Sequence, residues 1–170
     1  MVKAKDIAQK KICYDEAVLM CHPFAQQWNG CCLKTWVELL KREGCKQQTP
    51  FKKEKALDLD DVEKRLATQK SGKESTVDFV MGLSDKTLLM IEAKLNVKAA
   101  QNISATEIRS KINHSKALLR QGWDANIATP VVVLFNDVVC SRAKNELKRK
   151  FAANPNVVIA SVRDLHERFF

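Results

Sequence analysis

Three charged residues, Asp78, Glu92 and Lys94, stand within the largely apolar stretch STVDFVMGLSDKTLLMIEAKL that runs from Ser75 to Leu95. An ionised side chain is rarely buried unless it is paired or binds a metal, because its desolvation costs several kcal/mol. Two carboxylates and one amine are the groups with which a hydrolytic site holds a divalent cation and orients a water molecule. Chemistry of this kind requires that a hairpin bring the three side chains onto one face.

The turn between the two predicted strands decides which face Asp78 occupies. Side chains alternate between the two faces of a sheet, and residues directly opposite each other in an antiparallel pair share a face. With a three-residue loop at 84–86, Asp78 lies opposite Glu92, with the Cβ atoms about 5 Å apart. A two-residue loop at 84–85 would pair Asp78 with Ile91 and place the acid on the other face. The register of the hairpin therefore tests whether Asp78 and Glu92 lie on the same face of the sheet.

We expect a cation between the two carboxylates of the predicted pair, Asp78 and Glu92. Carboxylates this close repel each other and shift each other's pKa unless a positive charge lies between them. Oxygen ligands favour Mg²⁺, for which Mn²⁺ can substitute, with water and a substrate phosphate in the remaining positions. Lys94 shares the face of Glu92, where its ammonium could orient the attacking water and neutralise charge on the phosphate. The three residues predict phosphodiester hydrolysis.

The segments before the hairpin are predicted to be mainly helical. Residues 1–44 should form N-terminal packing helices, one over Ala4 to Met20 and one that starts at Leu33 and ends at Gly44. A polar connector follows, and helical spacing of apolar residues returns over 56–70.

Helices and strands alternate after the hairpin. Ser104 is the predicted N-cap of a helix that ends near Gly122. A continuous apolar strand at 130–135, a basic helix at 141–152 and a strand at 156–162 follow, and a short terminal helix closes the chain. This order predicts an α/β domain in which helices flank a mixed central β-sheet.

The hairpin sequence VDFVMGLSDKTLLMIEAKL resembles the PD-(D/E)xK nuclease superfamily, with Val77-Asp78 at the PD element and Glu92-Ala93-Lys94 as (D/E)xK. Val77 stands where the family motif has proline. The resemblance covers the hairpin, the following helix and the strand PVVVLF. It implies a restriction endonuclease-like core of helix, three strands, helix and strand (αβββαβ) and a Mg²⁺-dependent endonuclease that cleaves DNA. In it Asp78, Glu92 and the carbonyl of Ala93 hold the metal, and Lys94 assists the attacking water.

Many members of that superfamily carry an additional acid on the first core helix. By position Glu38 is the candidate for this catalytic acid, with Glu16 and Glu63 as alternatives. If Glu38 is the acid, residues 45–51 would contain the first strand of the sheet and residues 51–73 would be an insertion.

The charge of the chain favours a polyanionic partner. The formal net charge is +9 and the isoelectric point is near 9.3. Between Lys98 and Lys150, ten basic residues face four acidic ones, so the excess lies downstream of the hairpin. We expect DNA as the partner, although a solvated helix flank is the alternative for the helix after the hairpin. The candidate contacts are Lys111, His114, Lys116, Lys148 and Arg149.

Length and composition predict one soluble, cytoplasmic domain over residues 1–170. The chain contains no run of eighteen apolar residues, and its first residues mix charges with apolar positions, unlike a signal peptide. No membrane partner is therefore expected. The six cysteines form no C-x-x-C pair and are predicted to be reduced and mostly buried. A zinc site is disfavoured by irregular spacing; its candidates would be Cys21, His22, Cys31, Cys32 and Cys45.

Two other functions remain open at the level of the sequence. The first is a catalytically inactive nuclease-like domain that binds nucleic acid or a protein partner. The second is an interaction domain in which the charged residues of the hairpin form a buried ion pair. A homodimer and a protein inhibitor also remain open as partners.

Overall fold

A computed structural model of the chain describes residues 10–67, 72–154 and 156–170. The strands are β1 (Leu33–Thr35), β2 (Lys55–Asp58), β3 (Phe79–Gly82), β4 (Leu88–Ala93), β5 (Val131–Phe135) and β6 (Val157–Ser161). The helices are α1 (Glu16–Met20), α2 (Pro23–Gln27), α3 (Trp36–Arg42), α4 (Leu59–Ala67), α5 (Ala105–Leu119), α6 (Asp137–Leu147) and α7 (Val162–Phe169), with a 3₁₀ turn, η1, at Ala100–Asn102.

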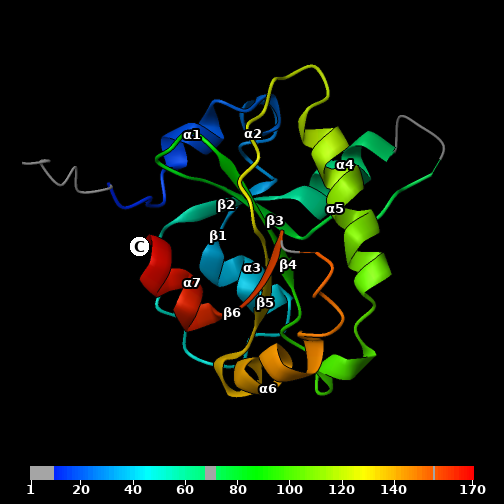
Figure 1. The fold of residues 1–170 in the computed structure, drawn as a ribbon. Coiled ribbons are helices and arrows are strands. Elements are labelled where there is room, and N and C mark those ends of the chain that lie inside the picture. The colour runs from blue at the N-terminus through cyan, green and yellow to red at the C-terminus, as the bar shows by residue number, and fades with distance from the viewer. Residues whose placement is uncertain (1–9, 68–71, 155) are drawn as a thin grey trace, which may run out of the picture.

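In this part of the chain the strands form one mixed sheet with helices on both of its faces (Figure 1). Their order in the sheet is their order along the chain, from β1 to β6. The pairs β1–β2, β2–β3 and β3–β4 are antiparallel, whereas β5 is parallel to β4 and β6 is parallel to β5. The helices α5 and α6 make the crossovers that parallel neighbours require. The predicted α/β class with a mixed sheet is confirmed.

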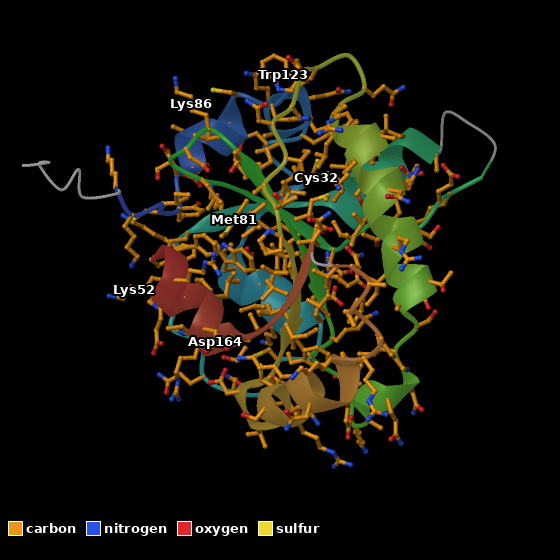
Figure 2. All side chains as sticks on the ribbon, in the orientation of Figure 1. Cys32, Lys52, Met81, Lys86, Trp123 and Asp164 are labelled. Carbon is orange, nitrogen blue, oxygen red and sulfur yellow. The ribbon has the colours of Figure 1, made fainter. Side chains whose placement is uncertain are left out.

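Alternating side chains of the hairpin divide the core into two layers. Val80, Leu88 and Met90 belong to the cluster that includes buried residues of α1, α4, α5 and α6. Met81 and Leu89 belong to the opposite cluster, with residues of α3 and α7. Figure 2 shows Met81 in the interior of the molecule. Each polar side chain of the hairpin therefore also lies on the face of one of these two layers.

The register of the hairpin is the one that a three-residue loop predicts. Gly82 pairs with Leu88, and Phe79 pairs with Ile91. The loop closes through a hydrogen bond from Leu83 N–H to Thr87 O at 2.9 Å. Lys86 takes the left-handed conformation, with φ of 66°, that such a loop needs at its last position. The next pair beyond Phe79 and Ile91 sets Asp78 opposite Glu92, as the sequence predicted.

Two elements downstream of the hairpin also agree with the sequence. All residues of β5 are buried, as expected of a strand covered on both faces. Helix α5 starts after Ser104, whose side chain accepts a hydrogen bond from Glu107 N–H at 3.2 Å. It ends at Leu119, shortly before Gly122, which has φ of +69°. Helix α6, by contrast, starts at Asp137 and ends at Leu147, because Asn136 rather than Ser141 provides its first carbonyl acceptors.

The N-terminal segment corrects the predicted helix over residues 4–20. Within the described part, α1 begins only at Glu16, after its N-cap Asp15, while residues 4–9 lie outside the described ranges. Tyr14 is extended instead, since its N–H donates to Phe169 O at 2.8 Å and it bridges Leu83. Backbone pairing with the hairpin therefore replaces the helix at these positions.

Two short strands that the sequence did not predict lie within residues 33–58. The predicted helix from Leu33 begins at Trp36, because Thr35 caps it and Leu33–Thr35 pairs with β2 as an edge strand. Residues 45–51 contain no strand. Strand β2, which pairs with β1 and β3, replaces the helix predicted from residue 56 and lies inside the expected insertion 51–73. Only α4 and the residues after it separate β2 from β3.

The thiols agree with one prediction and contradict another. All six cysteines are free, in line with the expected reduced state. Only Cys32 and Cys140 are buried, whereas Cys21 is exposed and the others are half-buried, so the expectation of mostly buried thiols was wrong.

Among the helices of the described ranges, none combines the length and the hydropathy of a membrane span.

Candidate active site

Asp78 and Glu92 meet where β3 begins and β4 ends. Asp78 is half-buried directly before β3, while Glu92 lies in β4 and is fully buried. Ala93 donates its backbone N–H to Asp78 Oδ2 at 2.7 Å. This contact ties the carboxylate of one strand to the backbone of the other, so the hairpin itself places Asp78 beside Glu92.

Two lysines approach one oxygen of Glu92. Lys94 Nζ lies 2.8 Å from Glu92 Oε1, and Lys111 Nζ, which comes from α5, lies 2.7 Å from the same atom. The other oxygen, Glu92 Oε2, is buried and has no hydrogen-bond partner among the described residues. A buried carboxylate oxygen without a partner is costly, which indicates that this side of Glu92 is suited to a further ligand.

The pKa of Asp78 reflects its burial first and the charge of Glu92 second. Burial raises the pKa of Asp78 to about 8, and the charge of Glu92 adds to the rise. The N–H of Ala93 and the ammonium of Lys111 act in the opposite direction. For Lys111, burial lowers the pKa, but the attraction of Glu92 outweighs it and the net pKa is raised. Asp78 thus lacks a sufficient cation, whereas Lys111 is held in its charged form.

Two acids of α3, Glu38 and Glu43, differ in their relation to Asp78. Glu38 is exposed and belongs to the capping box of α3, where its Oε2 accepts a hydrogen bond from Thr35 N–H at 2.9 Å. Glu43, at the C-cap of the same helix, is instead among the charges that raise the pKa of Asp78. The alternatives lie elsewhere: Glu16 is in the first turn of α1, and Glu63 contacts His114. A sequence signal for Glu43 existed in the adjacent Gly44, which marks the helix end.

Gly44 brings that helix end close to β4. Its φ of +90° favours glycine, and a Cβ at this position would lie 1.9 Å from Asn96 Oδ1. Asn96 follows Lys94 by two residues, so the close approach of Gly44 and Asn96 sets the chain after β4 against the end of α3. The absence of a side chain at Gly44 therefore lets the end of α3, which carries Glu43, pack close to Asn96.

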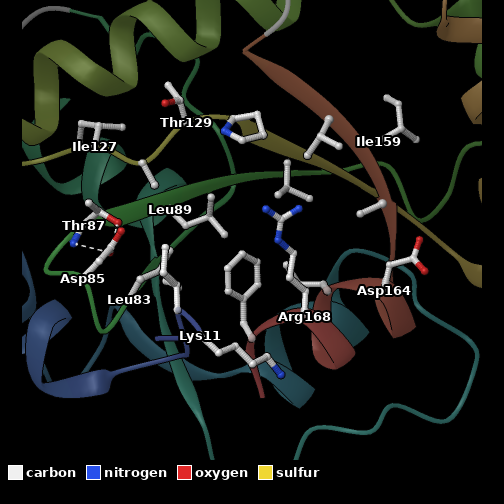
Figure 3. Close-up of a pocket in the computed structure, with 18 of the residues that line it drawn as sticks. Lys11, Leu83, Asp85, Thr87, Leu89, Ile127, Thr129, Ile159, Asp164 and Arg168 are labelled. Carbon is white, nitrogen blue, oxygen red and sulfur yellow. Dashed lines mark hydrogen bonds between the residues drawn. The ribbon is translucent and has the colours of Figure 1, made fainter. Parts of the chain in front are cut away.

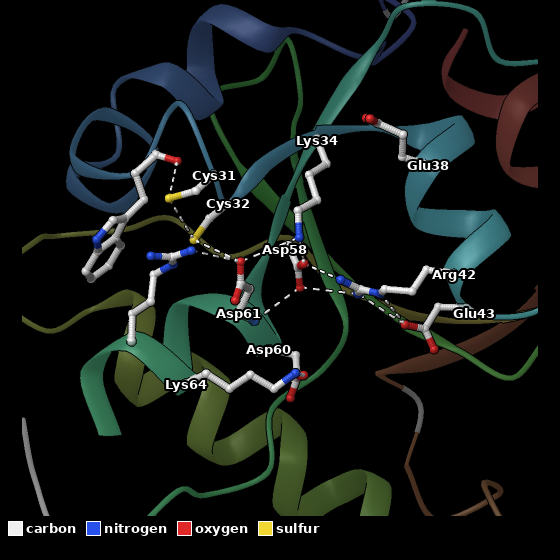
Figure 4. Close-up of polar contacts among 12 residues, drawn as sticks. Cys31, Cys32, Lys34, Glu38, Arg42, Glu43, Asp58, Asp60, Asp61 and Lys64 are labelled. Carbon is white, nitrogen blue, oxygen red and sulfur yellow. Dashed lines mark hydrogen bonds and ion pairs between the residues drawn. The ribbon is translucent and has the colours of Figure 1, made fainter. Parts of the chain in front are cut away.

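A buried ion-pair cluster lies beside this helix end (Figure 4). The side chain of Asp58 is fully buried and binds Arg42 and Lys34, the latter at 2.7 Å. Burial opposes ionisation of Asp58, but the hydrogen bonds from Arg42 and Lys34 outweigh it and lower the pKa of the carboxyl. Arg42 also contacts Glu43 at 3.1 Å, while Figure 4 shows Glu38 pointing away from the cluster. The cluster holds the helix that carries Glu43 against β2.

The donor set of the site fits a hard cation in part. Within residues 10–67, 72–154 and 156–170, no three His, Cys, Asp or Glu side chains are grouped to hold a metal ion. The candidate ligands are two carboxylates, Asp78 and Glu92, and the carbonyl of Ala93. Their chemistry suits Mg²⁺ or Mn²⁺, which retain several waters, and the unpartnered Glu92 Oε2 is an oxygen that such an ion would satisfy.

The predicted nucleic-acid contacts are dispersed over the fold. Lys111 belongs to the acid pair rather than to an outer surface. His114 lies between two acids, with Nε2 3.3 Å from Glu63 Oε2 and Nδ1 3.0 Å from Glu74 Oε2. The remaining candidates are half-buried on α5 or exposed at the end of α6: Lys116, Lys148 and Arg149.

A large cavity in the described part of the chain lies on the other face of the sheet, against α7 (Figure 3). It has a volume of about 900 Å³, and its lining includes Leu89, Val132 and Arg168. Leu89 and Val132 belong to the core layer opposite that of Met90, the residue that shares a face with Glu92. The cavity is thus separate from the paired carboxylates.

The zinc alternative is not supported by the contacts of His22. Its Nδ1 accepts a hydrogen bond from Phe24 N–H at 3.1 Å, and its Nε2 lies 2.8 Å from Leu119 O. Both ring nitrogens thus bind the backbone, and burial lowers the pKa of the imidazole. His22 is a structural residue between α2 and α5.

No protein-family model, curated protein or solved structure matches the chain.

Proposed function

We propose that the protein is a Mg²⁺-dependent endonuclease that cleaves phosphodiester bonds of DNA. The proposal depends on one observation: the hairpin register sets Asp78 opposite Glu92, and a buried oxygen of Glu92 has no partner among the described residues. Two acids that approach each other without a sufficient cation form an unfavourable arrangement unless a ligand completes it. A divalent cation is the ligand that satisfies both acids.

Each residue of the site has a separate role in this proposal. Asp78, Glu92 and the carbonyl of Ala93 would hold the metal. When bound, Mg²⁺ or Mn²⁺ supplies a positive charge that stabilises the developing negative charge on the phosphate. Lys111 holds Glu92 Oε1 and fixes the orientation of that carboxylate. Lys94 is 20 % exposed, which leaves its ammonium accessible to a water molecule or a phosphate oxygen.

The order of elements around the hairpin supports the proposal. The series α3, β2, β3, β4, α5 and β5 runs helix, three antiparallel strands, helix and parallel strand. This is the order that the resemblance to the PD-(D/E)xK superfamily implies, with α4 added between β2 and β3. The net charge of +9 favours a polyanion such as DNA.

Cleavage of supercoiled plasmid and linear DNA with Mg²⁺, Mn²⁺ or EDTA tests the function. We expect the wild type to cut with either metal and to be inactive in EDTA. Lys94→Ala should slow cleavage by at least about 100-fold, the usual contribution of a group that assists proton transfer. Lys53→Ala, which removes an exposed lysine outside the site, is the matched control. Equal cleavage by the wild type and Lys94→Ala would show that the assignment is wrong.

One observation favours the alternative of an interaction domain with a buried ion pair. Lys94 and Lys111 both contact Glu92, so the three residues could form a permanent ion-pair cluster that excludes a metal. Isothermal titration with Mn²⁺ separates the two functions. Binding that is lost in Glu92→Gln supports the nuclease, whereas absence of binding by the wild type supports the ion-pair interpretation.

A further inference from the structure

The segment that carries Asp78 has no regular structure of its own. Residues 72–77 are neither helix nor strand, and Asp78 precedes the first residue of β3. A carboxylate at the end of such a segment needs anchors on either side to keep its place within the tolerance that catalysis requires. Ala93 N–H provides one at the side chain. The other anchor must act through the preceding residues.

Helix α5 provides that second anchor through Ser115. The hydroxyl of Ser115 accepts a hydrogen bond from Val77 N–H at 2.9 Å. Both residues are fully buried, so water does not compete for this bond. Without the hydroxyl, the N–H of Val77 would be a buried donor with no acceptor, and the segment would move to find one.

The same helix holds the start of the segment and the other acid. His114 contacts Glu74 Oε2 at 3.0 Å, and Glu74 N–H donates to Glu63 Oε1 at 3.2 Å. One turn earlier, Lys111 contacts Glu92. Residues 111, 114 and 115 share a face of α5, since positions three and four apart are neighbours on a helix. A single face of α5 thus contacts Glu92 and the segment that leads to Asp78.

From these contacts we propose that Ser115 is a positioning residue: its hydrogen bond to Val77 sets the place of Asp78 opposite Glu92. As a step in catalysis, this inference rests on the function proposed above. The position of Asp78 can nevertheless be measured without any metal or substrate, because its Oδ2 accepts the hydrogen bond from Ala93 N–H at 2.7 Å.

The test compares variants at Ser115 with a matched control. Ser115→Ala removes the acceptor, Ser115→Cys keeps most of the volume with a weak acceptor, and Ser115→Thr keeps the hydroxyl. Ser161→Ala removes another serine hydroxyl that accepts a backbone N–H at 2.9 Å, at the N-cap of α7 on the opposite face. If Ser115→Ala does not fold, Ser115→Cys alone decides the test.

Two readouts distinguish positioning from a general loss of stability. In metal-free protein, amide hydrogen exchange of Ala93 N–H, which donates to Asp78 Oδ2, should be faster in Ser115→Ala and Ser115→Cys, and unchanged in Ser115→Thr and Ser161→Ala. Mn²⁺ affinity should fall about tenfold in the first two variants only, as expected when a residue that supports metal ligands is lost. Wild-type exchange of Ala93 N–H in both Ser115→Ala and Ser115→Cys would overturn the inference.

The outcomes also separate this inference from the proposed function. If the wild type binds no Mn²⁺ and cleaves no DNA while the exchange of Ala93 N–H still accelerates in Ser115→Ala and Ser115→Cys, the function fails and the positioning role stands. If the wild type binds Mn²⁺ and the Ser115 variants bind it equally well, the function stands and the positioning role fails.

Discussion

Lys111 of α5 and Glu92 of β4 are 19 residues apart in sequence, yet Lys111 Nζ lies 2.7 Å from Glu92 Oε1. The side chain of Glu92 is fully buried and that of Lys111 is 16 % exposed, so this ion pair is largely removed from solvent. Because Lys94 contacts the same oxygen, Oε1 of Glu92 has two ion-pair partners, whereas its buried Oε2 has no hydrogen-bond partner among the described residues. The predictions for Lys111 and for divalent metal depend on this difference between the two oxygens.

Lys111→Met should destabilise the fold, because it keeps the apolar stem but leaves Glu92 with Lys94 as its sole remaining ion-pair partner among the described residues. We expect the free energy of unfolding to fall by about 1–3 kcal/mol, the usual effect of leaving a buried polar group short of a partner. Urea denaturation at neutral pH without metal measures it. Lys116→Met, a change on the same helix away from Glu92, is the control, and an equal loss in both variants would contradict the role of Lys111.

The raised pKa of Asp78 predicts a specific pH dependence of stability. Its pKa is about 8 in the folded protein against 3.8 for an unperturbed aspartate. Below pH 4 the group is protonated in both folded and unfolded states, so it has no effect on stability. As pH rises from about 4 to 8, the unfolded chain releases this proton first, and the folded state loses stability by a few kcal/mol.

Asp78→Asn should remove the loss of stability that the titration of Asp78 causes between about pH 4 and 8. In metal-free buffer the variant should gain stability relative to the wild type as pH is raised from 4 to 8, and the difference should level off above pH 8. Paired denaturation curves across this range measure it. A difference that stays constant with pH would mean that Asp78 titrates normally.

Divalent metal should stabilise the wild type and not the variants that lack a ligand. A ligand at 100 times its Kd adds about 2.7 kcal/mol to the free energy of unfolding. We therefore expect Mn²⁺ to raise the Tm of the wild type and to leave Glu92→Gln and Asp78→Asn unchanged. Differential scanning calorimetry with a Mn²⁺ series measures the shift. A shift that persists in Glu92→Gln would place the metal at another site.

The Asp58 cluster should contribute to folding rather than to chemistry. Asp58→Asn leaves Arg42 and Lys34 without their buried carboxylate, and we expect a loss of about 3 kcal/mol. Asp60 is 29 % exposed and pairs with Lys64 and Lys73, so Asp60→Asn should cost at most about 1 kcal/mol. Thermal denaturation of the two variants makes the comparison. Similar losses would show that burial of Asp58 has no energetic weight.

Basic residues at the end of α6 should affect DNA affinity and not the chemical step. Lys148 and Arg149 are both exposed. Lys148→Ala with Arg149→Ala should weaken binding equally for all sequences and reduce the slope of log K against log salt by about 1 for each lost phosphate contact. Fluorescence anisotropy at several salt concentrations tests this, with Lys53→Ala as the control. An unchanged slope would exclude this end of α6 from the DNA interface.

Local patterns in the sequence determined the hairpin and its neighbours. The three-residue loop at 84–86 set the register of Asp78 and Glu92, because side chains alternate along a strand and a shift of one residue reverses every face. The cap at Ser104 and the apolar run of β5 were equally readable, since each depends on residues adjacent in the chain. These features decide the candidate acid pair and its place in the sheet.

Tertiary structure decided what the sequence order does not bring together. Strands β1 and β2 have three and four residues, too few for a periodic pattern, and they exist through pairing with each other and with β3. The charge of Glu43 rather than that of Glu38 helps to raise the pKa of Asp78, and Glu38 is held in the capping box of α3. Lys111 reached Glu92, and Ser115 reached Val77, because α5 crosses the face of the sheet. Such contacts depend on how helices pack on a sheet, and no local pattern of residues encodes the distance between a helix side chain and a strand side chain.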